Sequence, residues 1–196
     1  MNQAELYVIV LAAGAPPASV PPSSWRRSMV DRCCTWRFAR AVELAGAAVT
    51  VVLGARAADI APLLRHTGAS VVINREWAEG MGSSVRAGVA RLPAAADAAL
   101  LMLADQPAVS TDDLRRLVSS WRRQPHCMVA ALYAGTVGVP AIFPREDFAA
   151  LSALRGDTGA RALLKRGGDR VVRVPLPSAA LDIDTPEDLM KLQKSL

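Results

Sequence analysis

After a short polar start, the chain enters the run Leu6-Tyr7-Val8-Ile9-Val10-Leu11-Ala12-Ala13-Gly14, which is almost entirely apolar and rich in β-branched residues. A run of this kind is typical of a central parallel strand that is buried on both faces. Gly14 allows the backbone to turn sharply after the strand and to approach a ligand closely. In an open α/β sheet, nucleotides bind at the carboxyl ends of the strands. We therefore expect a ligand site beside Gly14.

Helical and strand patterns alternate through the chain after residue 40. The apolar, β-branched runs predict strands at 48–53, 70–73, 98–104, 128–133 and 171–174. Helices are predicted up to residue 45, at 59–65 and 83–92, and after residues 110, 161 and 185. Alternation of this kind implies right-handed crossovers and a parallel sheet. The expected fold class is therefore α/β.

The length of 196 residues and a hydrophobic content of 52% fit one sizeable core, so we expect a single domain over residues 1–196. The apolar runs are too short to cross a membrane, and the N-terminus lacks the basic and apolar regions of a signal peptide. The cytoplasm is the expected location.

The basic charge of the chain is local. Of the net charge of +5, residues 26–40 contribute +4, through five arginines set against one aspartate. A nucleic-acid binder would need a wider basic face with interleaved aromatic residues. We therefore expect no nucleic-acid partner.

A segment rich in glycine and serine follows the third predicted strand and opens the next helix: Gly80-Met81-Gly82-Ser83-Ser84. Backbone N–H groups and hydroxyls at the positive end of a helix dipole suit a phosphate or the edge of a base. The alternative is an ordinary helix cap with its loop, which the pattern supports equally well.

Asp105 follows the predicted strand at 98–104, where a carboxylate can hold Mg²⁺ against the phosphates of a nucleotide. The alternative is a turn-forming aspartate before a helix. Ser110 and Asp113 have the spacing of a capping box, so the following helix does not need Asp105 as its cap. The sequence therefore makes Asp105 a candidate metal ligand.

Two later segments carry further candidates. Arg155-Gly156-Asp157-Thr158-Gly159-Ala160-Arg161 contains two glycines that suit an anion-accepting loop, or else a plain helix start. Asp182 and Asp184 alternate on an extended segment before the terminal helix and point to opposite sides, so only one of them can face a metal. We choose Asp184, with Asp182 as the alternative.

Together these segments resemble the MobA-like NTP transferases, and most closely the molybdenum-cofactor (molybdopterin) cytidylyltransferases. Residues 11–14 resemble the opening motif of that family, and residues 74–85 its N-P-x-W-x-x-G-M-x-x-S-L segment, with Arg75 in place of the usual proline. The family's metal-binding turn, its G-x-P-x-x-F run and its D-I-D-T-P-E-D-L motif have counterparts at 105–107, 138–143 and 182–189. The resemblance covers the chain except residues 15–38.

The resemblance implies a three-layer α/β/α Rossmann-like nucleotidyltransferase fold, of the nucleotide-diphospho-sugar transferase type, with a mostly parallel sheet. It also implies that an acceptor phosphate attacks the α-phosphate of an NTP and expels pyrophosphate, with Mg²⁺ held by Asp105 and Asp184. The residues it assigns to the nucleotide are Leu11, Ala12, Ala13, Gly14, Gly80, Met81, Ser83 and Ser84. The residues it assigns to the acceptor are Gly138, Pro140, Gly156, Asp157, Gly159 and Arg161.

The substrates follow from finer detail of the same resemblance. Leu-Ala-Ala-Gly at 11–14 is more similar to the cytidylyl branch than to the guanylyl branch, so CTP and molybdopterin are the expected substrates and GTP is the alternative. A molybdoenzyme or its chaperone is a further candidate partner. A sugar phosphate or another small molecule is the alternative acceptor.

Residues 15–38 depart from the family pattern. They hold four prolines, two tryptophans and two cysteines, and they show neither a helical nor a strand period. The family's signature arginine and lysine align with Ala18 and Ser23. A nucleotide-binding or chaperone-like protein of molybdoenzyme maturation would tolerate that loss, and it stands as the alternative to an enzyme.

The genetic code suggests an origin for this segment. When the codons of residues 15–39 are read one nucleotide earlier, they permit the missing motif, and some shifted residues are forced. Met29 into Val30 gives glycine, and Cys33 into Cys34 gives leucine. We hypothesise an out-of-frame reading, from a sequencing error or from compensating frameshifts; the alternative is a natural proline-rich loop.

Overall fold

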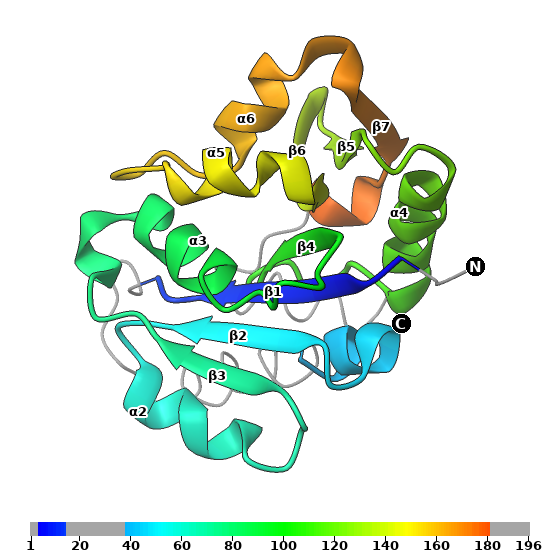
Figure 1. Cartoon of the computed structure of the whole chain (residues 1–196). Coiled ribbons are helices and arrows are strands. Elements are labelled where there is room, and N and C mark those ends of the chain that lie inside the picture. The colour runs from blue at the N-terminus through cyan, green and yellow to red at the C-terminus, as the bar shows by residue number, and fades with distance from the viewer. Residues whose placement is uncertain (1–3, 15–37, 181–196) are drawn as a thin grey trace.

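The computed structural model describes residues 4–14 and 38–180, and a seven-stranded sheet in the order β3-β2-β1-β4-β6-β5-β7 forms its centre (Figure 1). The strands are β1 (Leu6–Ala12), β2 (Val49–Leu53), β3 (Ser70–Ile73), β4 (Ala98–Leu103), β5 (Met128–Tyr133), β6 (Thr136–Pro144) and β7 (Val171–Pro175). β3, β2, β1 and β4 are parallel, and so are β5 and β7. β6 is antiparallel to both of its neighbours. The expected mostly parallel sheet is confirmed.

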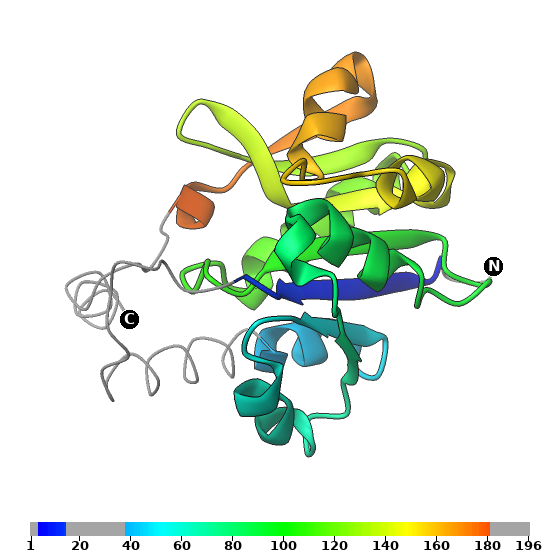
Figure 2. The ribbon, with the colours of Figure 1, turned by 90° about the vertical axis from the view of Figure 1, so that its left-hand side faces the viewer.

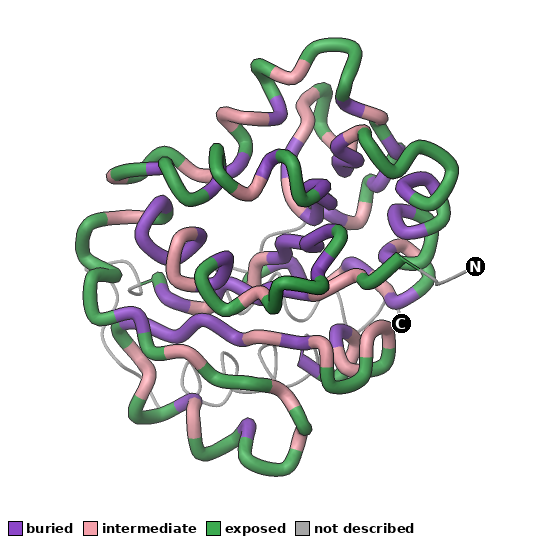
Figure 3. The backbone as a smooth tube through the Cα atoms, viewed as in Figure 1, coloured by how far each residue is buried: buried purple, intermediate pink, exposed green. Residues whose placement is uncertain are grey.

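β1 lies in the interior of the sheet, between β2 and β4, and its side chains are apolar on both faces. Val8 and Val10 pack in one core cluster with residues of β2, β4 and α4 (Thr111–Arg123). Ile9 and Leu11 pack in a second cluster with residues of α3 (Met81–Val89) and α5 (Phe148–Ser152). Val8, Ile9 and Val10 are completely buried. Figure 3 shows buried residues, in purple, gathered in the middle of the molecule. Two cores on opposite faces of one sheet give the three-layer α/β/α arrangement.

The helices divide between the two faces. The helical residues 38–45 and α4 supply Phe38, Ala41, Leu114, Leu117 and Trp121 to the core on one face, and α3, α5 and α6 supply Val85, Val89, Leu151 and Leu164 to the core on the other. The α-helices are α2 (Ala57–Ile60), α3 (Met81–Val89), α4 (Thr111–Arg123), α5 (Phe148–Ser152) and α6 (Arg161–Arg166). The short 3₁₀ helices of the described residues are η1 (Ala61–Leu64), η2 (Trp77–Glu79), η3 (Arg145–Asp147), η4 (Gly168–Arg170) and η5 (Pro177–Ala180).

Two predicted helices differ from the observed ones. The helix expected at 59–65 is a short α-helix, α2, that continues as the 3₁₀ helix η1, because Pro62 near the start of η1 lacks the N–H group that a continuing α-helix would use. α3 begins at Met81 and ends at Val89, not at 83 and 92. Gly80 occupies the N-cap position without any side-chain cap, so the sequence carries no ordinary capping signal there.

β6 was missed by the pattern analysis. It is a strand of nine residues joined to β5 by Ala134 and Gly135, which have φ angles of 47° and 72°. Positive φ at both central residues is the signature of a tight hairpin turn. The chain therefore reverses at this turn and inserts an antiparallel strand between β4 and β5.

The capping box predicted from Ser110 and Asp113 is confirmed. The Ser110 hydroxyl accepts a hydrogen bond from the Asp113 N–H at 3.1 Å, and the Asp113 carboxylate accepts one from the Ser110 N–H at 3.0 Å. No helix within residues 4–14 and 38–180 combines the length and the apolar character needed to cross a bilayer.

Candidate functional site

The carboxyl ends of β3, β2, β1 and β4 meet at one edge of the sheet. The register pairs Ile73 with Leu53, Leu53 with Ala12, and Leu11 with Leu103. The residues that follow these strands are therefore neighbours, and they include Gly14 after β1 and Asp105 after β4. In Figure 2 the end of β1, the loop after β4 and η5 all lie on the left-hand side. The ligand site predicted beside Gly14 would therefore lie at this edge of the sheet.

The end of β1 lies between the loops after β2 and β4. The Ala104 N–H donates to the Leu11 carbonyl at 3.1 Å, and the Ala55 N–H donates to the Ala13 carbonyl at 3.3 Å. A Cβ atom on Gly54 would lie 2.7 Å from Cβ of Trp77 and closer still to the Ala13 carbonyl oxygen. Gly54 is therefore required for these loops to approach one another. Gly14 is exposed.

The segment from Asn74 to Gly82, called the glycine loop below, is organised by a buried amide. Asn74 is 5% exposed, and its Nδ2 donates to the hydroxyls of Ser83 at 2.8 Å and Ser84 at 3.1 Å. The Ser83 hydroxyl in turn donates to the Gly80 carbonyl at 2.8 Å. Both serine hydroxyls thus take part in hydrogen bonds within the chain, and their assignment to a nucleotide stays a prediction.

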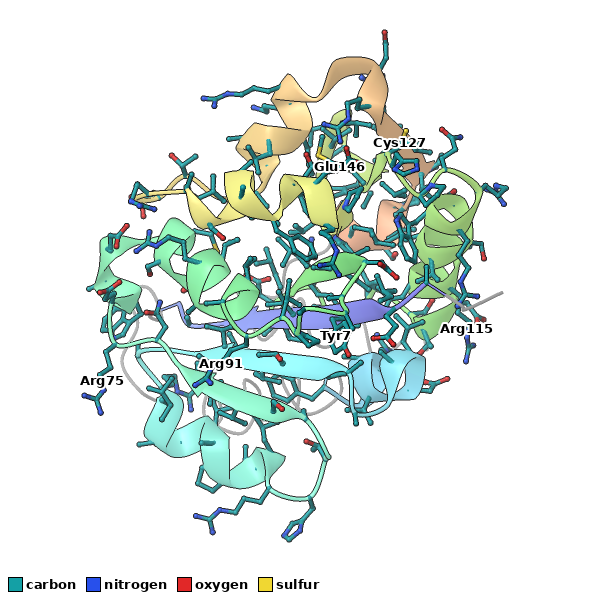
Figure 4. All side chains as sticks on the ribbon, viewed as in Figure 1. Tyr7, Arg75, Arg91, Arg115, Cys127 and Glu146 are labelled. Atoms are coloured by element: carbon teal, nitrogen blue, oxygen red, sulfur yellow. The ribbon has the colours of Figure 1, made fainter. Side chains whose placement is uncertain are left out.

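The exposed part of the glycine loop is made of other residues. Met81 is 38% exposed, Trp77 is 37% exposed, and Gly80 is half-buried. Arg75, which replaces the proline of the family pattern, extends away from the sheet (Figure 4). A ligand beside this loop would therefore meet the Met81 side chain and the Gly80 backbone before it reached the serines.

The glycine loop packs directly against the loop 154–160, which contains Gly156, Asp157 and Gly159, three of the residues that the resemblance assigns to the acceptor. The Gly82 N–H donates to the Gly156 carbonyl at 2.9 Å, and the Gly156 N–H donates to the Glu79 carboxylate at 3.2 Å. A Cβ atom on Gly80 would lie 2.6 Å from both the carbonyl carbon and the oxygen of Gly156, and one on Gly159 would lie 3.1 Å from Cγ of Met81. The predicted nucleotide and acceptor segments therefore form one continuous surface here.

Glu79 and Arg86 add an ion pair to this contact, and neither residue was singled out from the sequence. Arg86 donates to both carboxylate oxygens of Glu79, at 2.7 Å and 2.5 Å, and to the Leu154 carbonyl at 2.8 Å. The hydrogen bond from Arg86, followed by that from the Gly156 N–H, lowers the pKa of Glu79 to about 2. The partners come from η2, α3 and a distant loop, so no local sequence pattern marks them.

Asp105 is exposed and is the second residue of the segment 104–109, called the Asp105 turn below. The next residue, Gln106, is 2% exposed and donates from Nε2 to the carbonyls of Val139 and Ala179, each at 3.0 Å. On the other side of the turn, the Arg40 guanidinium donates to the Pro107 carbonyl at 2.6 Å and to the Val109 carbonyl at 2.5 Å. The turn is therefore held from both sides.

The Gly138–Pro140 run lies beside the Asp105 turn. β6 pairs Ala141 with Leu101 of β4, so the residues before Ala141 extend toward the carboxyl end of β4. Gly138 is buried, and a Cβ atom there would lie 3.0 Å from Cζ of Tyr133. Gly138 and Pro140 thus share an edge with Asp105.

Arg161 and Asp157 are exposed residues of the other predicted acceptor segment. The Arg161 guanidinium donates to the Thr136 hydroxyl, which links the start of α6 to the start of β6. Their assignment to the acceptor stays a prediction.

Asp182 and Asp184 lie outside the described residues, as does the segment 15–37. The chain that leads to them is anchored through η5. The Ser178 hydroxyl donates to the Asp113 carboxylate at 2.8 Å, in addition to the Gln106 contact with Ala179. Burial alone would raise the pKa of Asp113, but hydrogen bonds from Ser110 and Ser178 outweigh it and lower that pKa.

The donor set at the edge suits a hard divalent cation only in part. Asp105 supplies a carboxylate, the ligand type that Mg²⁺ and Mn²⁺ prefer. Within residues 4–14 and 38–180, however, no three histidines, cysteines or carboxylates cluster as a ready metal site. A site with few protein ligands fits Mg²⁺, because this cation keeps several waters and also takes phosphate oxygens of the substrate.

Two proteins of known name are similar to this chain in sequence. The purine catabolism protein PucB of Bacillus subtilis is 34% identical over 131 residues, which are 65% of this chain and 62% of PucB. The nicotine blue oxidoreductase of Paenarthrobacter nicotinovorans is 29% identical over 201 residues, which are 94% of each chain.

A solved structure, Rv0371c of Mycobacterium tuberculosis in complex with manganese, matches with a TM-score of 0.73 and 29% identity over 98% of this chain and 100% of that one. The model of the MobA-like NTP transferase domain matches residues 29–171. This match covers most of the chain, which therefore belongs to the MobA-like NTP transferase family.

Proposed function

We propose that this protein is a Mg²⁺-dependent nucleotidyltransferase that transfers a nucleoside monophosphate from an NTP, with CTP favoured, to a phosphorylated acceptor such as molybdopterin. One observation carries the proposal: the end of β1, the Asp105 turn and the Gly138–Pro140 run lie at one edge of a sheet of the MobA-like family. The glycine loop follows β3 at the same edge. This arrangement supports a nucleotide and an acceptor lying side by side.

The reaction forms a bond between an acceptor phosphate oxygen and the α-phosphorus and breaks the bond from that phosphorus to the oxygen that bridges to the β-phosphate. Pyrophosphate leaves with the electron pair of the broken bond. Residues 11–14 and 80–82 would bind and orient the nucleotide through their backbone, because small residues allow a close approach. Asp105, with Asp184 as the predicted second ligand, would hold the cation, which when bound neutralises phosphate charge.

The metal assignment rests on two supports. Asp105 is an exposed carboxylate at the carboxyl end of β4, and the related Rv0371c structure was obtained with manganese. Mn²⁺ and Mg²⁺ accept the same oxygen ligands, so we propose Mg²⁺ as the working cation and Mn²⁺ as a probe that can replace it.

We expect the chain as written to bind nucleotide weakly and to transfer it poorly. The positions of the family's signature arginine and lysine hold Ala18 and Ser23, which carry no charge. Loss of one preorganised electrostatic donor costs on the order of 10²–10³ in rate, so the loss of two leaves little turnover. Nucleotide binding should suffer less, because the residues of the glycine loop and Asp105 remain.

The test is pyrophosphate release from CTP or GTP with Mg²⁺ and acceptor. This polypeptide is compared with a version in which residues 15–38 are recoded to the shifted frame. We expect the recoded version to be faster by at least about 10²-fold. Equal rates would show that residues 15–38 are a working variant, and nucleotide binding without release from either version would favour the maturation protein.

Nucleotide binding itself is measured by thermal shift with a panel of nucleotides. Ligand at 100 times its dissociation constant stabilises a protein by roughly 2.7 kcal/mol, which is readily visible. A shift with CTP that requires Mg²⁺ supports the proposal, and the absence of a shift with every NTP contradicts it.

A redox function is the second candidate, because the relative matched over 94% of both chains is called an oxidoreductase. It would use the same edge to bind a reduced dinucleotide in place of an NTP. Oxidation of NADH or NADPH in the presence of a quinone-like dye, without pyrophosphate release from any NTP, would favour this candidate over nucleotidyl transfer.

A further inference from the structure

Gln106 joins three segments that are distant in the sequence. It follows Asp105 in the Asp105 turn, and its Nε2 donates to the carbonyl of Val139 in β6 and to that of Ala179 in η5, each at 3.0 Å. Val139 lies between Gly138 and Pro140, the two residues of β6 assigned to the acceptor. One buried amide thus links the Asp105 turn to the Gly138–Pro140 run of β6 and to the end of η5.

The orientation of this amide is fixed by its partners. Both partners are carbonyl oxygens, so only the NH₂ group can face them, and the opposite orientation would place Oε1 against two acceptors. Among residues 4–14 and 38–180, no donor reaches Oε1, although this atom is buried. An unsatisfied buried oxygen opposes the stability that the two donated hydrogen bonds provide. Gln106 is therefore poorly explained as a residue that serves stability alone.

The contacts of Arg40 with the same turn show what Gln106 adds. Arg40 donates to the carbonyls of Pro107 and Val109, but it belongs to the helical residues 38–45. It therefore connects the turn to that helix and not to β6. The contact with Val139 is what fixes the turn relative to β6. Loss of the Gln106 amide should therefore leave the turn folded but free to shift against the acceptor side.

We propose that Gln106 is a positioning residue that fixes the Asp105 carboxylate relative to β6 and η5, and so sets the place of a bound cation beside the acceptor. The inference rests on the proposed function. Residues that orient a metal ligand without binding the metal change metal affinity by about 10- to 100-fold when they are replaced. The role therefore predicts a loss of metal affinity that a variant losing a buried polar contact elsewhere in the fold does not show.

The experiment measures the affinity of the full chain for Mn²⁺, from the electron paramagnetic resonance signal of the unbound ion in the presence of CTP. Gln106→Met keeps the length of the side chain and removes both donated hydrogen bonds. We expect Mn²⁺ to bind about 10-fold more weakly. Hydrogen exchange should become faster in residues 104–109, and the melting temperature should fall by several degrees, because two carbonyls lose their donor. Gln106→Glu keeps the shape but turns oxygens toward both carbonyls, so it should weaken binding at least as much.

The matched control is Asp147→Asn. Asp147 is also a buried polar residue, 8% exposed, and its carboxylate accepts from Arg170 at 3.2 Å and 3.3 Å. It lies near the other end of β4, because the Arg145 N–H donates to the Asp97 carbonyl at 2.8 Å. This variant should bind Mn²⁺ with the affinity of the unsubstituted chain.

The outcomes separate the inference from the proposed function. If the unsubstituted chain binds Mn²⁺ and both Gln106 variants bind it equally well, Gln106 has no positioning role and the inference is wrong. A loss of affinity in Asp147→Asn as large as in Gln106→Met would also overturn it, since the effect would then be general. If the unsubstituted chain itself binds no Mn²⁺ with CTP, the proposed function fails and the inference fails with it.

Discussion

The glycine loop and the Asp105 turn lie at the same edge of the sheet but are held by different kinds of contact. The glycine loop is fixed by close backbone contact with Gly156 and by the ion pair of Glu79 with Arg86. The Asp105 turn is fixed by the buried neutral amide of Gln106 and by carbonyls that accept from Arg40. One region depends on glycine and on a carboxylate that can be protonated in acid, whereas the other depends on an amide and a guanidinium, which are not protonated further in acid.

This difference predicts how each region responds to change. Close contact between backbones leaves no room for a side chain, so steric substitutions should act most strongly on the glycine loop. The contact through Glu79 should weaken in acid, because a protonated carboxyl no longer pairs with Arg86. The hydrogen bonds that Gln106 and Arg40 donate in the Asp105 turn involve no group that titrates between acid and neutral pH.

The largest effect is expected from Gly80→Ala. Gly80 has φ of 119° and ψ of −173°, a region essentially confined to glycine, and a Cβ atom would lie 2.6 Å from two backbone atoms of Gly156. Strain and overpacking together should cost roughly 3 kcal/mol. The melting temperature should fall by about 10 °C, measured by differential scanning calorimetry.

Gly135→Ala is the matched control for that variant. Gly135 also has positive φ, 72°, but nothing lies within 4 Å of the place its Cβ atom would take. It should therefore show only the dihedral strain, about 1 kcal/mol. Equal losses in the two variants would mean that the close contact between Gly80 and Gly156 does not form.

A smaller effect is expected from Asn74→Ala, which removes the inner support of the glycine loop and leaves the ion pair in place. The two serine hydroxyls lose a shared donor in a buried site, at a cost of about 2 kcal/mol in the free energy of unfolding. Urea unfolding measures this loss. Gln124→Ala removes an amide from an exposed position and should change little. If Asn74→Ala were as mild, the serines would have found other partners.

On the side of the Asp105 turn, Ser110→Ala removes the N-cap of α4. The hydroxyl satisfies the Asp113 N–H at 3.1 Å, so the variant should lose about 1 kcal/mol and about 3 °C in melting temperature. Ser178→Ala removes a different hydrogen bond to the same carboxylate and leaves the cap intact. A loss in Ser178→Ala that equals that of Ser110→Ala would show that the cap has no special weight and that the hydrogen bond to η5 stabilises this region as much.

Much of the fold follows from local patterns, because these patterns report burial. The strands expected at 70–73 and 128–133 are found as β3 and β5 with the same bounds, and the capping box was also predicted correctly. β6 was missed because its direction depends on two residues of positive φ, and Ala134 gives little sign of that. The start of α3 was misplaced because a glycine, not a side-chain cap, precedes it.

The candidate site could be predicted only for residues that directly follow a predicted strand. Gly14 and Asp105 could be placed at the same edge, since the carboxyl ends of parallel strands meet there. The contact of the glycine loop with Gly156, and the Glu79–Arg86 pair that supports it, depend on how α3 packs near the loop 154–160. No sequence pattern predicts the role of Gln106, because its partners Val139 and Ala179 are distant in the sequence.

The smallest expected effect is a dependence of stability on pH, which tests the ion pair of Glu79 with Arg86 in the glycine loop. Arg86 and the Gly156 N–H lower the pKa of Glu79 from an ordinary value of 4.5 to about 2 in the folded protein. A carboxyl with a lowered pKa stabilises the fold fully above its unfolded pKa and loses that contribution as the pH falls toward its folded pKa. The contribution of Glu79 should therefore be complete above about pH 5 and should decline steadily below about pH 4.5.

Glu79→Gln removes this dependence. The variant should melt at a lower temperature than the unsubstituted protein at about pH 7, and the difference should shrink as the pH falls from about 5 to 3. Glu76→Gln is the matched control, because Glu76 pairs with the same Arg86 at 3.3 Å but its side chain is 74% exposed. Exposed pairs contribute little, so this variant should follow the unsubstituted protein at every pH. A difference between Glu79→Gln and the unsubstituted protein that stays constant down to about pH 3 would mean that the charge of Glu79 contributes nothing and that the glycine loop is held by contacts that do not titrate.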